Sequence, residues 1–295
     1  MSISKVMNAK APQQVWQTTR FEIDLSRPLV MGIVNVTPDS FSDGGQHVSA
    51  KEAVDHCSHL VEEGADILDI GGESSRPGST SLSPEHEWAR IAPVLEVALS
   101  LGVPVSVDTC KAEVMARALD KGVDIINDIK ALRDEAALPL LRTYAQAGVC
   151  LMHMRGESST MQSMCDYGDV VAEVSAFLAE RARCAMDAGI DARRIVLDPG
   201  YGFAKNTPQN FELLARQSEL LALDFPILAG WSRKRSLGDV TGRSVDQRLA
   251  ASLAAGLAAL NQGARILRVH DVAPTVDAVK VWCAAAGAPA IPSRD

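Results

Sequence analysis

The chain has 295 residues, a length that predicts about two domains at ~150 residues each, although barrel folds keep this length in one domain. Its 47% hydrophobic and 22% charged residues are typical of a soluble globular protein with a substantial core. The net charge of −8 and the aromatic content of only 4% argue against general binding of nucleic acid or of an anionic membrane. An anionic small molecule is still compatible with this charge, provided that its basic contacts are local.

The sequence shows the pattern of neither a signal peptide nor a membrane-spanning segment. The first twenty residues mix Lys, Gln and Trp16 and lack the apolar core of a signal peptide. The longest apolar stretch, 249–260, is much shorter than the ~18 residues that span a bilayer. The six cysteines are scattered without a CxxC pair, and we expect them to be reduced. These features predict a cytoplasmic protein.

A repeated pattern organises the chain in sequence order: a helical stretch, a glycine, and a short run rich in Val, Ile and Leu. A glycine just past a helix takes the left-handed conformation that ends it, so each copy indicates a helix end followed by a strand. The glycines are Gly64, Gly102, Gly122, Gly148, Gly189 and Gly263. The runs predict strands at 30–35, 67–71, 103–107, 124–127, 149–153, 195–198, 226–230 and 265–269. The stretches between them predict helices at 50–63, 83–100, 111–121, 134–147, 166–188, 208–223, 244–262 and 273–286.

Eight strands alternating with eight helices predict an α/β protein, a (β/α)₈ barrel in one domain. A doubly wound open sheet is the alternative, but no G-x-G-x-x-G motif follows the first strand. We expect residues 1–28 to form an N-terminal extension, with a hairpin at the barrel floor as one arrangement. Residues 29–287 would form the barrel and 288–295 a C-terminal tail.

Catalytic groups of such barrels lie at the C-terminal ends of the strands, and here nearly every predicted strand ends in a polar residue. One Asp or Asn could equally cap a helix or form a turn. Eight polar residues on one rim are harder to explain in that way. They are Asn35, Asp69, Asp108, Asn127, His153, Asp198, Ser232 and His270.

Two polar loops with paired glycines follow the first two strands, at 35–45 and 71–78, and such loops often order over a substrate. Arg233, Lys234 and Arg235 begin a helix after the seventh strand, and Arg268 comes from the eighth. Barrels commonly bind phosphate in this region, where a helix N-terminus also favours an anion. The alternative is a solvated basic surface.

With these motifs in place, the chain resembles the dihydropteroate synthases, a family of pterin-binding enzymes. Its two signature segments are MGIVNVTPDSFSDGG at 31–45 and GADILDIGGESSRPG at 64–78. They are followed in family order by SVDT at 106–109, IND at 126–128, LDPG at 197–200, SRK at 232–234 and RVHD at 268–271. The resemblance covers residues from about 22 to 286. It implies a TIM barrel that condenses 6-hydroxymethyl-7,8-dihydropterin pyrophosphate with 4-aminobenzoate, and it implies Mg²⁺ and a homodimer.

The resemblance also implies roles for single residues. The polar edge of the pterin would be bound by Asp108, Asn127, Asp198 and Lys234, with Met154 as a pocket wall. Pyrophosphate departs before the amine attacks, and the residues given catalytic roles are Asp108, Lys234, Asp43 and Arg76. Of these, Asp108 and Asp43 would stabilise the pterin methylene cation.

The two remaining subsites follow from the same resemblance. Pyrophosphate contacts are expected from Asn35, Ser75, Arg76, Arg268 and His270, and Asn35 would give one oxygen to Mg²⁺. Aminobenzoate contacts are expected from Phe41, Ser75, Pro77, Phe203, Ser232 and Arg235. Many members have Thr at the position of Ser75 and Ser at the position of Arg235. Arg235 could therefore pair with the aminobenzoate carboxylate or point outward.

Three other functions are weighed against the synthase. A pterin-binding methyltransferase domain that uses methyltetrahydrofolate would share Asn127 and the carboxylates, but it needs neither the basic segment nor the Arg268 and His270 pair. A Schiff-base aldolase would use Lys234, yet it does not explain the two loops. A non-catalytic pterin-binding protein would lack the anion site. Asp69 is expected to support the barrel mouth by hydrogen bonding rather than to contact substrate.

Overall fold

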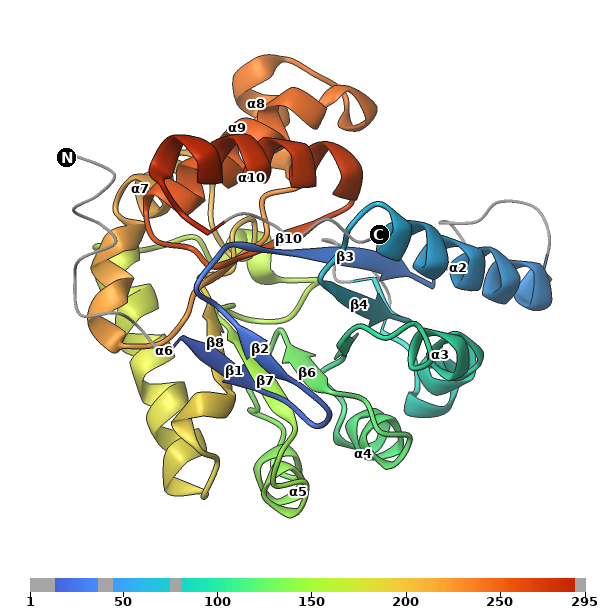
Figure 1. Ribbon diagram of the computed structural model, residues 1–295. Helices are drawn as coiled ribbons and strands as arrows, with labels where there is room; N and C mark the ends of the chain where they lie inside the picture. The colour runs from blue at the N-terminus through green and yellow to red at the C-terminus, as the bar shows by residue number, and fades with distance from the viewer. Residues whose placement is uncertain (1–13, 37–44, 75–80, 290–295) are drawn as a thin grey trace.

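Apolar parallel strands require cover on both faces, and helices surround the strands in the computed structural model, which describes residues 14–36, 45–74 and 81–289 (Figure 1). The parallel strands are β3 (Leu29–Asn35), β4 (Ile67–Gly71), β5 (Val105–Asp108), β6 (Ile125–Asp128), β7 (Gly148–Met152), β8 (Ile195–Asp198), β9 (Leu228–Ala229) and β10 (Ile266–Val269). Their order is β8-β7-β6-β5-β4-β3-β10-β9, and a parallel bridge from Leu197 to Ile227 joins the two ends. The predicted (β/α)₈ barrel is confirmed.

The helices follow one another around the barrel in chain order (Figure 1). They are α2 (Gly45–Glu62), α3 (Pro84–Ala98), α4 (Ala112–Asp120), α5 (Ala137–Thr143), α6 (Val170–Asp187), α7 (Thr207–Ala215), α8 (Arg235–Thr241), α9 (Leu249–Asn261) and α10 (Val272–Ala286). Short 3₁₀ turns are η1 (Met161–Ser163), η2 (Ala192–Arg194), η3 (Gln217–Leu223) and η4 (Val245–Gln247). None of the helices in the described ranges has the length and apolarity to cross a bilayer.

Two predicted helices differ from the structure. The helix expected at 208–223 divides into α7 and η3, and the one expected at 244–262 begins only at Leu249, after η4. The structure also has the separate helix α8, which left-handed Gly242 (φ 70°) ends. The recurrent glycines behave as expected at five positions with φ between 75° and 99°, but Gly148 is part of β7 instead.

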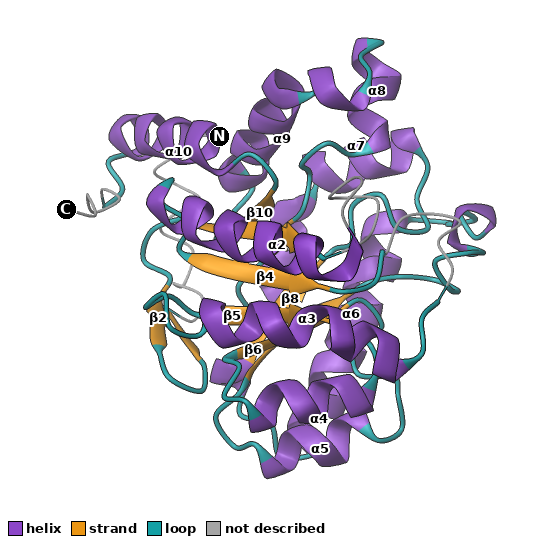
Figure 2. Cartoon of the chain, turned by 90° about the vertical axis from the view of Figure 1, so that its right-hand side faces the viewer, coloured by secondary structure: helices purple, strands orange, loops and turns teal. Residues whose placement is uncertain are grey.

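The floor of the barrel is covered by an antiparallel hairpin of β1 (Val15–Gln17) and β2 (Glu22–Asp24). Figure 2 shows β2 at the end of the barrel where the parallel strands begin. Trp16 is fully buried among the first residues of the strands, and its indole N–H donates to the Arg194 carbonyl at 2.9 Å. A Cβ on Gly148 would lie 3.0 Å from the Trp16 Nε1 atom, so the indole needs a glycine there. The division of the chain at residues 28 and 287 stays a prediction.

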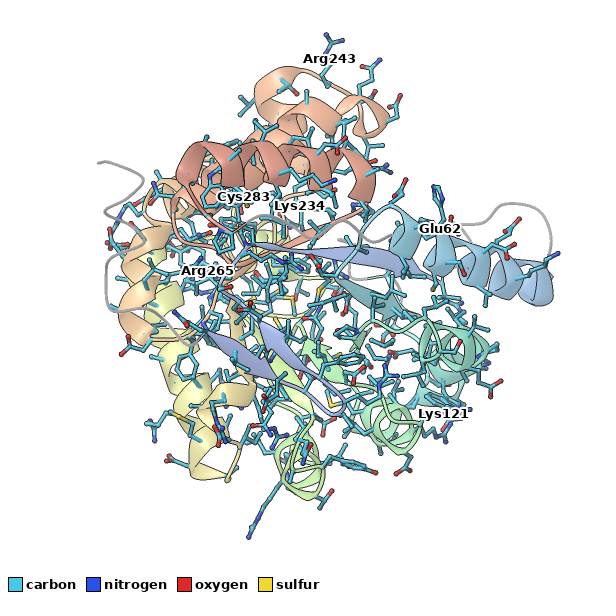
Figure 3. All side chains as sticks on the ribbon, in the orientation of Figure 1. Glu62, Lys121, Lys234, Arg243, Arg265 and Cys283 are labelled. Atoms are coloured by element: carbon cyan, nitrogen blue, oxygen red, sulfur yellow. The ribbon has the colours of Figure 1, made fainter. Side chains whose placement is uncertain are left out.

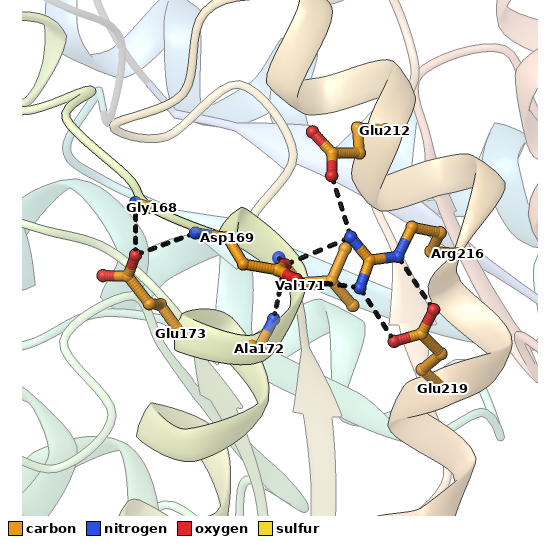
Figure 4. A network of polar contacts seen from close by, with 8 residues as sticks. All are labelled: Gly168, Asp169, Val171, Ala172, Glu173, Glu212, Arg216 and Glu219. Carbon is orange, nitrogen blue, oxygen red and sulfur yellow. Dashed lines mark hydrogen bonds and ion pairs between the residues drawn. The ribbon is translucent and has the colours of Figure 1, made fainter.

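A polar network ties two of the outer helices together (Figure 4). Arg216, which follows α7, forms ion pairs with Asp169, the N-cap of α6, at 3.0 Å and with Glu212 and Glu219 at 2.8 Å each. One guanidinium with several carboxylates is a stronger arrangement than an isolated surface pair. The network therefore fixes α6 to α7, the helices that follow β7 and β8.

Candidate active site

Side chains from four strands meet inside the mouth of the barrel. Arg268, on β10, donates through Nε to Asp69 Oδ2 at 2.6 Å and through its terminal nitrogen to Asp108 Oδ2 at 2.8 Å. Asn127 donates to the same Asp69 oxygen at 3.1 Å. Asp108 and Asn127 are paired in the register of β5 and β6, which brings them to one level of the rim. Asp69 is completely buried and orients Arg268 and Asn127, which agrees with the supporting role expected for it.

Burial sets the electrostatics of these groups. Desolvation raises the pKa of Asp108 above the ordinary range of an aspartate, and the neighbouring Arg268 opposes this shift. Burial alone would lower the pKa of Arg268, but Asp69 and Asp108 more than reverse this. The Asp198 carboxyl is also desolvated, which raises its pKa, although the Gly200 N–H stabilises the ionised form. A ligand that donates N–H groups here would favour the ionised carboxylates.

A second wall comes from the loop after β8. Asp198 Oδ1 accepts a hydrogen bond from the Gly200 N–H at 2.7 Å, and the turn that follows carries Phe203. Phe203 packs with buried Met154, and Lys234 Nζ lies 4.2 Å from the centre of the Phe203 ring. The structure thus brings Met154 and Lys234, two of the residues predicted to bind the pterin, into contact with Phe203 beside Asp198.

Ser232 and His270 form a third group. The backbone N–H of His270 donates to Ser232 Oγ at 3.1 Å, and its Nδ1 atom lies 3.0 Å from the same oxygen. Burial, followed by the charges of Arg268 and Arg233, lowers the pKa of His270 to about 3. His270 is therefore neutral at physiological pH and can donate a hydrogen bond to an anion without adding positive charge.

The turn before Lys234 is held on several sides. Arg233 has the left-handed φ of 59°, which is uncommon for a residue other than glycine. Its N–H donates to Ser252 Oγ at 2.9 Å, and its guanidinium forms an ion pair with Asp271 at 2.5 Å. Backbone strain of this kind persists only when the surroundings fix it, and it is frequent at functional sites.

Other predicted residues are placed differently. Arg235 opens α8 with its side chain 88% exposed and its Nε atom 3.7 Å from Asp239, so the structure does not bring it to the cluster. Asn35 ends β3 opposite Gly71 in the register with β4. The remaining predicted residues, Phe41, Asp43, Ser75, Arg76 and Pro77, lie outside the described residues.

The sequence reasoning missed one buried cation, Lys205. Its side chain is buried and bonds to His153 and to two backbone carbonyls, those of Gly200 and Phe203. The only signal in the sequence is its place five residues after Gly200 in the run GYGFAK. A lone lysine after a glycine-rich turn normally predicts a solvated side chain.

The donors present limit how a metal ion could be held. Within the described parts of the chain, no three His, Cys, Asp or Glu side chains are grouped to hold a metal. Asn35 offers one neutral oxygen, and Mg²⁺ usually keeps several waters and binds substrate phosphates. These residues fit a magnesium ion that arrives largely coordinated by a diphosphate, and they do not fit a cage made of protein ligands alone.

Comparison with known proteins shows the family to which the chain belongs. Residues 31–270 match the family described as pterin binding enzyme. A dihydropteroate synthase of Neisseria meningitidis serogroup B is 50% identical over 276 residues, 92% of this chain and 97% of the relative. The chain belongs to the dihydropteroate synthase family. A dihydropteroate synthase of Escherichia coli K12 is 48% identical over 263 residues, 88% of this chain and 92% of the relative.

Solved structures agree with this assignment. A dihydropteroate synthase of Xanthomonas albilineans with 4-aminobenzoic acid superposes with a TM-score of 0.88 at 50% identity, covering 94% of this chain and all of the other. The enzyme of that organism in complex with 7,8-dihydropteroate has a TM-score of 0.82 at 49% identity, with 91% of this chain and 97% of the other covered. Family and fold are therefore both confirmed.

Proposed function

We propose that this chain condenses 6-hydroxymethyl-7,8-dihydropterin pyrophosphate with 4-aminobenzoate to give 7,8-dihydropteroate and pyrophosphate. The observation that carries this function is the meeting of Asp108, Asn127, Asp198 and Lys234 at one barrel mouth, in a chain half identical to known dihydropteroate synthases. The enzyme is accordingly a transferase of folate synthesis. The solved relatives with 4-aminobenzoic acid and with 7,8-dihydropteroate support the same pair of ligands.

The pterin is recognised through its polar edge. Asp108 and Asp198 accept hydrogen bonds from the amino and amide N–H groups, and Asn127 can both donate and accept. Lys234 donates to the acceptor atoms of the ring, and Met154 provides an apolar wall. A ligand without this pattern would leave buried polar groups unpaired, which makes such a site selective.

The reaction replaces a C–O bond by a C–N bond. The C–O bond breaks first and its electron pair leaves with pyrophosphate, so that Asp108 and Asp43 stabilise the pterin methylene cation. The aminobenzoate nitrogen then donates its lone pair to that carbon and loses a proton. Preorganised charge and N–H donors should supply most of the rate enhancement, because charge develops on the leaving group.

The leaving group is held by Asn35, Ser75, Arg76, Arg268 and His270 in this proposal. His270 contributes an N–H donor rather than a charge, because burial keeps it neutral. Bound Mg²⁺ would neutralise part of the charge on the pyrophosphate oxygens. Asn35 supports this role because its carboxamide oxygen belongs to the rim at the end of β3.

Aminobenzoate occupies the outer part of the mouth in this proposal. Phe41, Pro77 and Phe203 form apolar walls for its ring, and Ser75 and Ser232 contribute hydroxyl groups. Arg235 is proposed as a partner of its carboxylate, although its exposed position on α8 gives little support to a direct contact. The 2% to 8% exposure of Trp231, Ser232 and Phe203 supports a preformed inner wall.

The alternative functions are less well supported. A methyltransferase domain would not need Ser232, Lys234 and His270 gathered at the rim, and the most similar relatives named above are synthases. A Schiff-base aldolase would require an isolated neutral amine, whereas Lys234 lies over an aromatic ring beside Arg233.

We also propose that the enzyme is a cytoplasmic homodimer that needs Mg²⁺. The absence of a membrane-crossing helix among the described residues is compatible with this location. Sedimentation at micromolar concentration tests the dimer, and turnover after removal of Mg²⁺ with a chelator tests the metal requirement. A monomer, or full activity without the metal, would contradict the respective proposal.

The decisive experiment follows pyrophosphate release. Purified protein is mixed with the pterin pyrophosphate, 4-aminobenzoate and Mg²⁺, and 7,8-dihydropteroate is measured in parallel. We expect both products in equal amounts, and 7,8-dihydropteroate only when aminobenzoate is present. A folded protein that releases neither product would overturn the proposed function.

A further inference from the structure

Lys205 is a buried lysine that forms no ion pair with a carboxylate in the described structure. Only 2% of it is exposed, and its Nζ atom lies 2.9 Å from the Gly200 carbonyl, 3.0 Å from the Phe203 carbonyl and 2.9 Å from His153 Nδ1. An ammonium group has three N–H donors, and these three acceptors use all of them. Lysine is almost never fully buried without a charged partner, so this arrangement requires an explanation.

The three acceptors belong to the parts of the chain that carry the pterin wall. His153 directly follows β7 and precedes Met154, and its backbone N–H donates to the Asp198 carbonyl at 2.9 Å. Gly200 and Phe203 begin and end the turn whose first N–H binds the Asp198 carboxylate. Lys205 therefore fastens the end of β7 to the turn after β8.

His153 can accept this hydrogen bond because it is neutral. Burial, followed by the charges of Lys205 and Arg155, lowers the pKa of His153 to about 2. Its Nδ1 lone pair is consequently available to the Lys205 ammonium throughout the physiological range. The His153 ring is itself fixed by an edge-to-face contact with Phe177 at 4.9 Å between ring centres.

The charge of Lys205 acts on Asp198. Burial lowers the pKa of Lys205 to about 7; Asp198 opposes this shift, whereas Lys234 and Arg155 reinforce it. The other groups that influence Asp198 are the Gly200 N–H, Lys234 and Arg268, and all of them favour its ionised form together with Lys205. Cys165 also faces Lys205, but its burial raises its pKa, so it is a neutral thiol. Lys205 is thus charged below about pH 7, and this charge opposes the rise that burial causes in the pKa of Asp198.

We propose that Lys205 is a positioning residue for the pterin: its three hydrogen bonds hold the turn at 200–203 against His153 at the end of β7. This inference rests on the proposed function, because it assigns Asp198, Met154 and Phe203 to pterin recognition. It predicts a selective effect on the pterin side of the reaction. A lysine that only filled the core would affect stability and both substrates alike.

The test replaces Lys205 by methionine, which keeps an unbranched chain of similar length but removes the donors and the charge. In K205M we expect KM for the pterin pyrophosphate to rise about tenfold, a typical cost of losing one charge-assisted contact, while KM for aminobenzoate changes less than about twofold. The affinity for 6-hydroxymethyl-7,8-dihydropterin, measured by calorimetry, should fall as the pH is lowered. In K205M this fall should begin at a higher pH than in the wild type, because Asp198 protonates more readily without the Lys205 charge.

K121M is the matched control, since it makes the same replacement at a surface lysine. Lys121 pairs with Glu96 beside α4, and Figure 3 shows it far from Lys234. We expect its kinetics and its pterin binding to equal those of the wild type. K205Q serves as a second variant if K205M does not fold, because it keeps N–H donors without the charge. Its KM for the pterin pyrophosphate should rise less than that of K205M. The pH dependence of its pterin affinity should shift towards higher pH by the same amount, because both variants lack the charge.

Parallel changes in the KM of both substrates with an unshifted binding profile would overturn the inference, as would unchanged kinetics in both Lys205 variants. These outcomes differ from failure of the proposed function, in which the wild-type protein would show neither turnover nor binding of the pterin.

Discussion

The ammonium nitrogen of Lys234 lies 4.2 Å from the centre of the Phe203 ring. The two residues come from different loops, after β9 and after β8, and the contact therefore joins the loops of two neighbouring strands at the mouth. A cation over an aromatic face contributes about 0.5–2 kcal/mol, depending on how far it is desolvated. Gly202 makes the approach possible, because a Cβ there would lie 3.0 Å from Lys234 Cδ.

Replacing Lys234 by alanine should impair catalysis without unfolding the protein. We expect kcat/KM for the pterin pyrophosphate to fall about 10²- to 10³-fold, since in the proposed site the ammonium donates to the pterin near the developing charge. The melting temperature should change little because the side chain is partly exposed. Steady-state kinetics and thermal unfolding measure the two effects. An unfolded variant would indicate a structural lysine instead.

Replacing Arg268 by methionine should destabilise the protein as well as inactivate it. The change leaves Asp69 and Asp108 buried without their guanidinium, and loss of one partner from such a group costs about 3 kcal/mol or more. The loss should be largest at neutral pH and smaller in acid, because protonation of Asp108, whose pKa burial already raises, removes one of the stranded charges. Urea unfolding at pH 5 and pH 8 measures this, with R193A, an exposed pair with Asp191, as the control. Equal losses at both pH values would argue against stranded carboxylates.

Pterin binding should depend on carboxylates that titrate above the ordinary aspartate range. The pKa values of Asp108 and Asp198 are raised by burial. In the proposed site their ionised forms accept hydrogen bonds from the pterin. As pH falls through these raised values the carboxylates become protonated, so affinity should fall. Calorimetry with 6-hydroxymethyl-7,8-dihydropterin, which has no phosphate to titrate, measures this between about pH 4.5 and 8. In D198N the pterin affinity should be weak and should depend less on pH. A pH dependence equal to that of the wild type would exclude Asp198 as the titrating group.

His270 should act as a neutral donor. Because burial lowers its pKa to about 3, its titration should not appear in rate profiles between about pH 5 and 8. H270Q restores an N–H donor near the position of Nε2 and should retain at least about tenfold more activity than H270A. Equal losses in the two variants would indicate that the imidazole has a role other than donation.

Trp16 should matter for stability and not for catalysis. Removing its side chain in W16A leaves a cavity in the barrel floor and should cost about 3–5 kcal/mol, while KM for both substrates stays unchanged in the folded protein. Denaturant unfolding and kinetics below the transition measure these two quantities. W282A, on α10, is the control and should cost less, because Trp282 is only half-buried. A raised KM in W16A would mean that the floor and the mouth are coupled.

The barrel could be predicted from the sequence because its signals are local. Each repeat consists of a glycine after a helix, then an apolar run, then a polar residue at the end of that run. These three features lie within a few residues of one another. The division around α8 was harder to predict, because it depends on Gly242 and on contacts between helices. A helix as short as α8 has few positions at which a periodic pattern can be recognised.

The composition of the site was predictable, but its pairings were not. Arg268 was expected to bind pyrophosphate, and in the structure it contacts Asp69 and Asp108, which precede it by 199 and 160 residues. No local pattern encodes such a contact. Lys205 was missed for the same reason, since its acceptors are two backbone carbonyls and a histidine 52 residues away.

The last strand of the barrel, β10, pairs with the first parallel strand, β3, and it carries Arg268. During synthesis Asp69 and Asp108 emerge well before the guanidinium that neutralises them. A nascent chain that ends before Ile266 would have to desolvate these carboxylates without compensation, which opposes early closure of the barrel. We therefore expect that a chain truncated before β10 lacks a stable barrel, because Asp69 and Asp108 would lose their guanidinium partner.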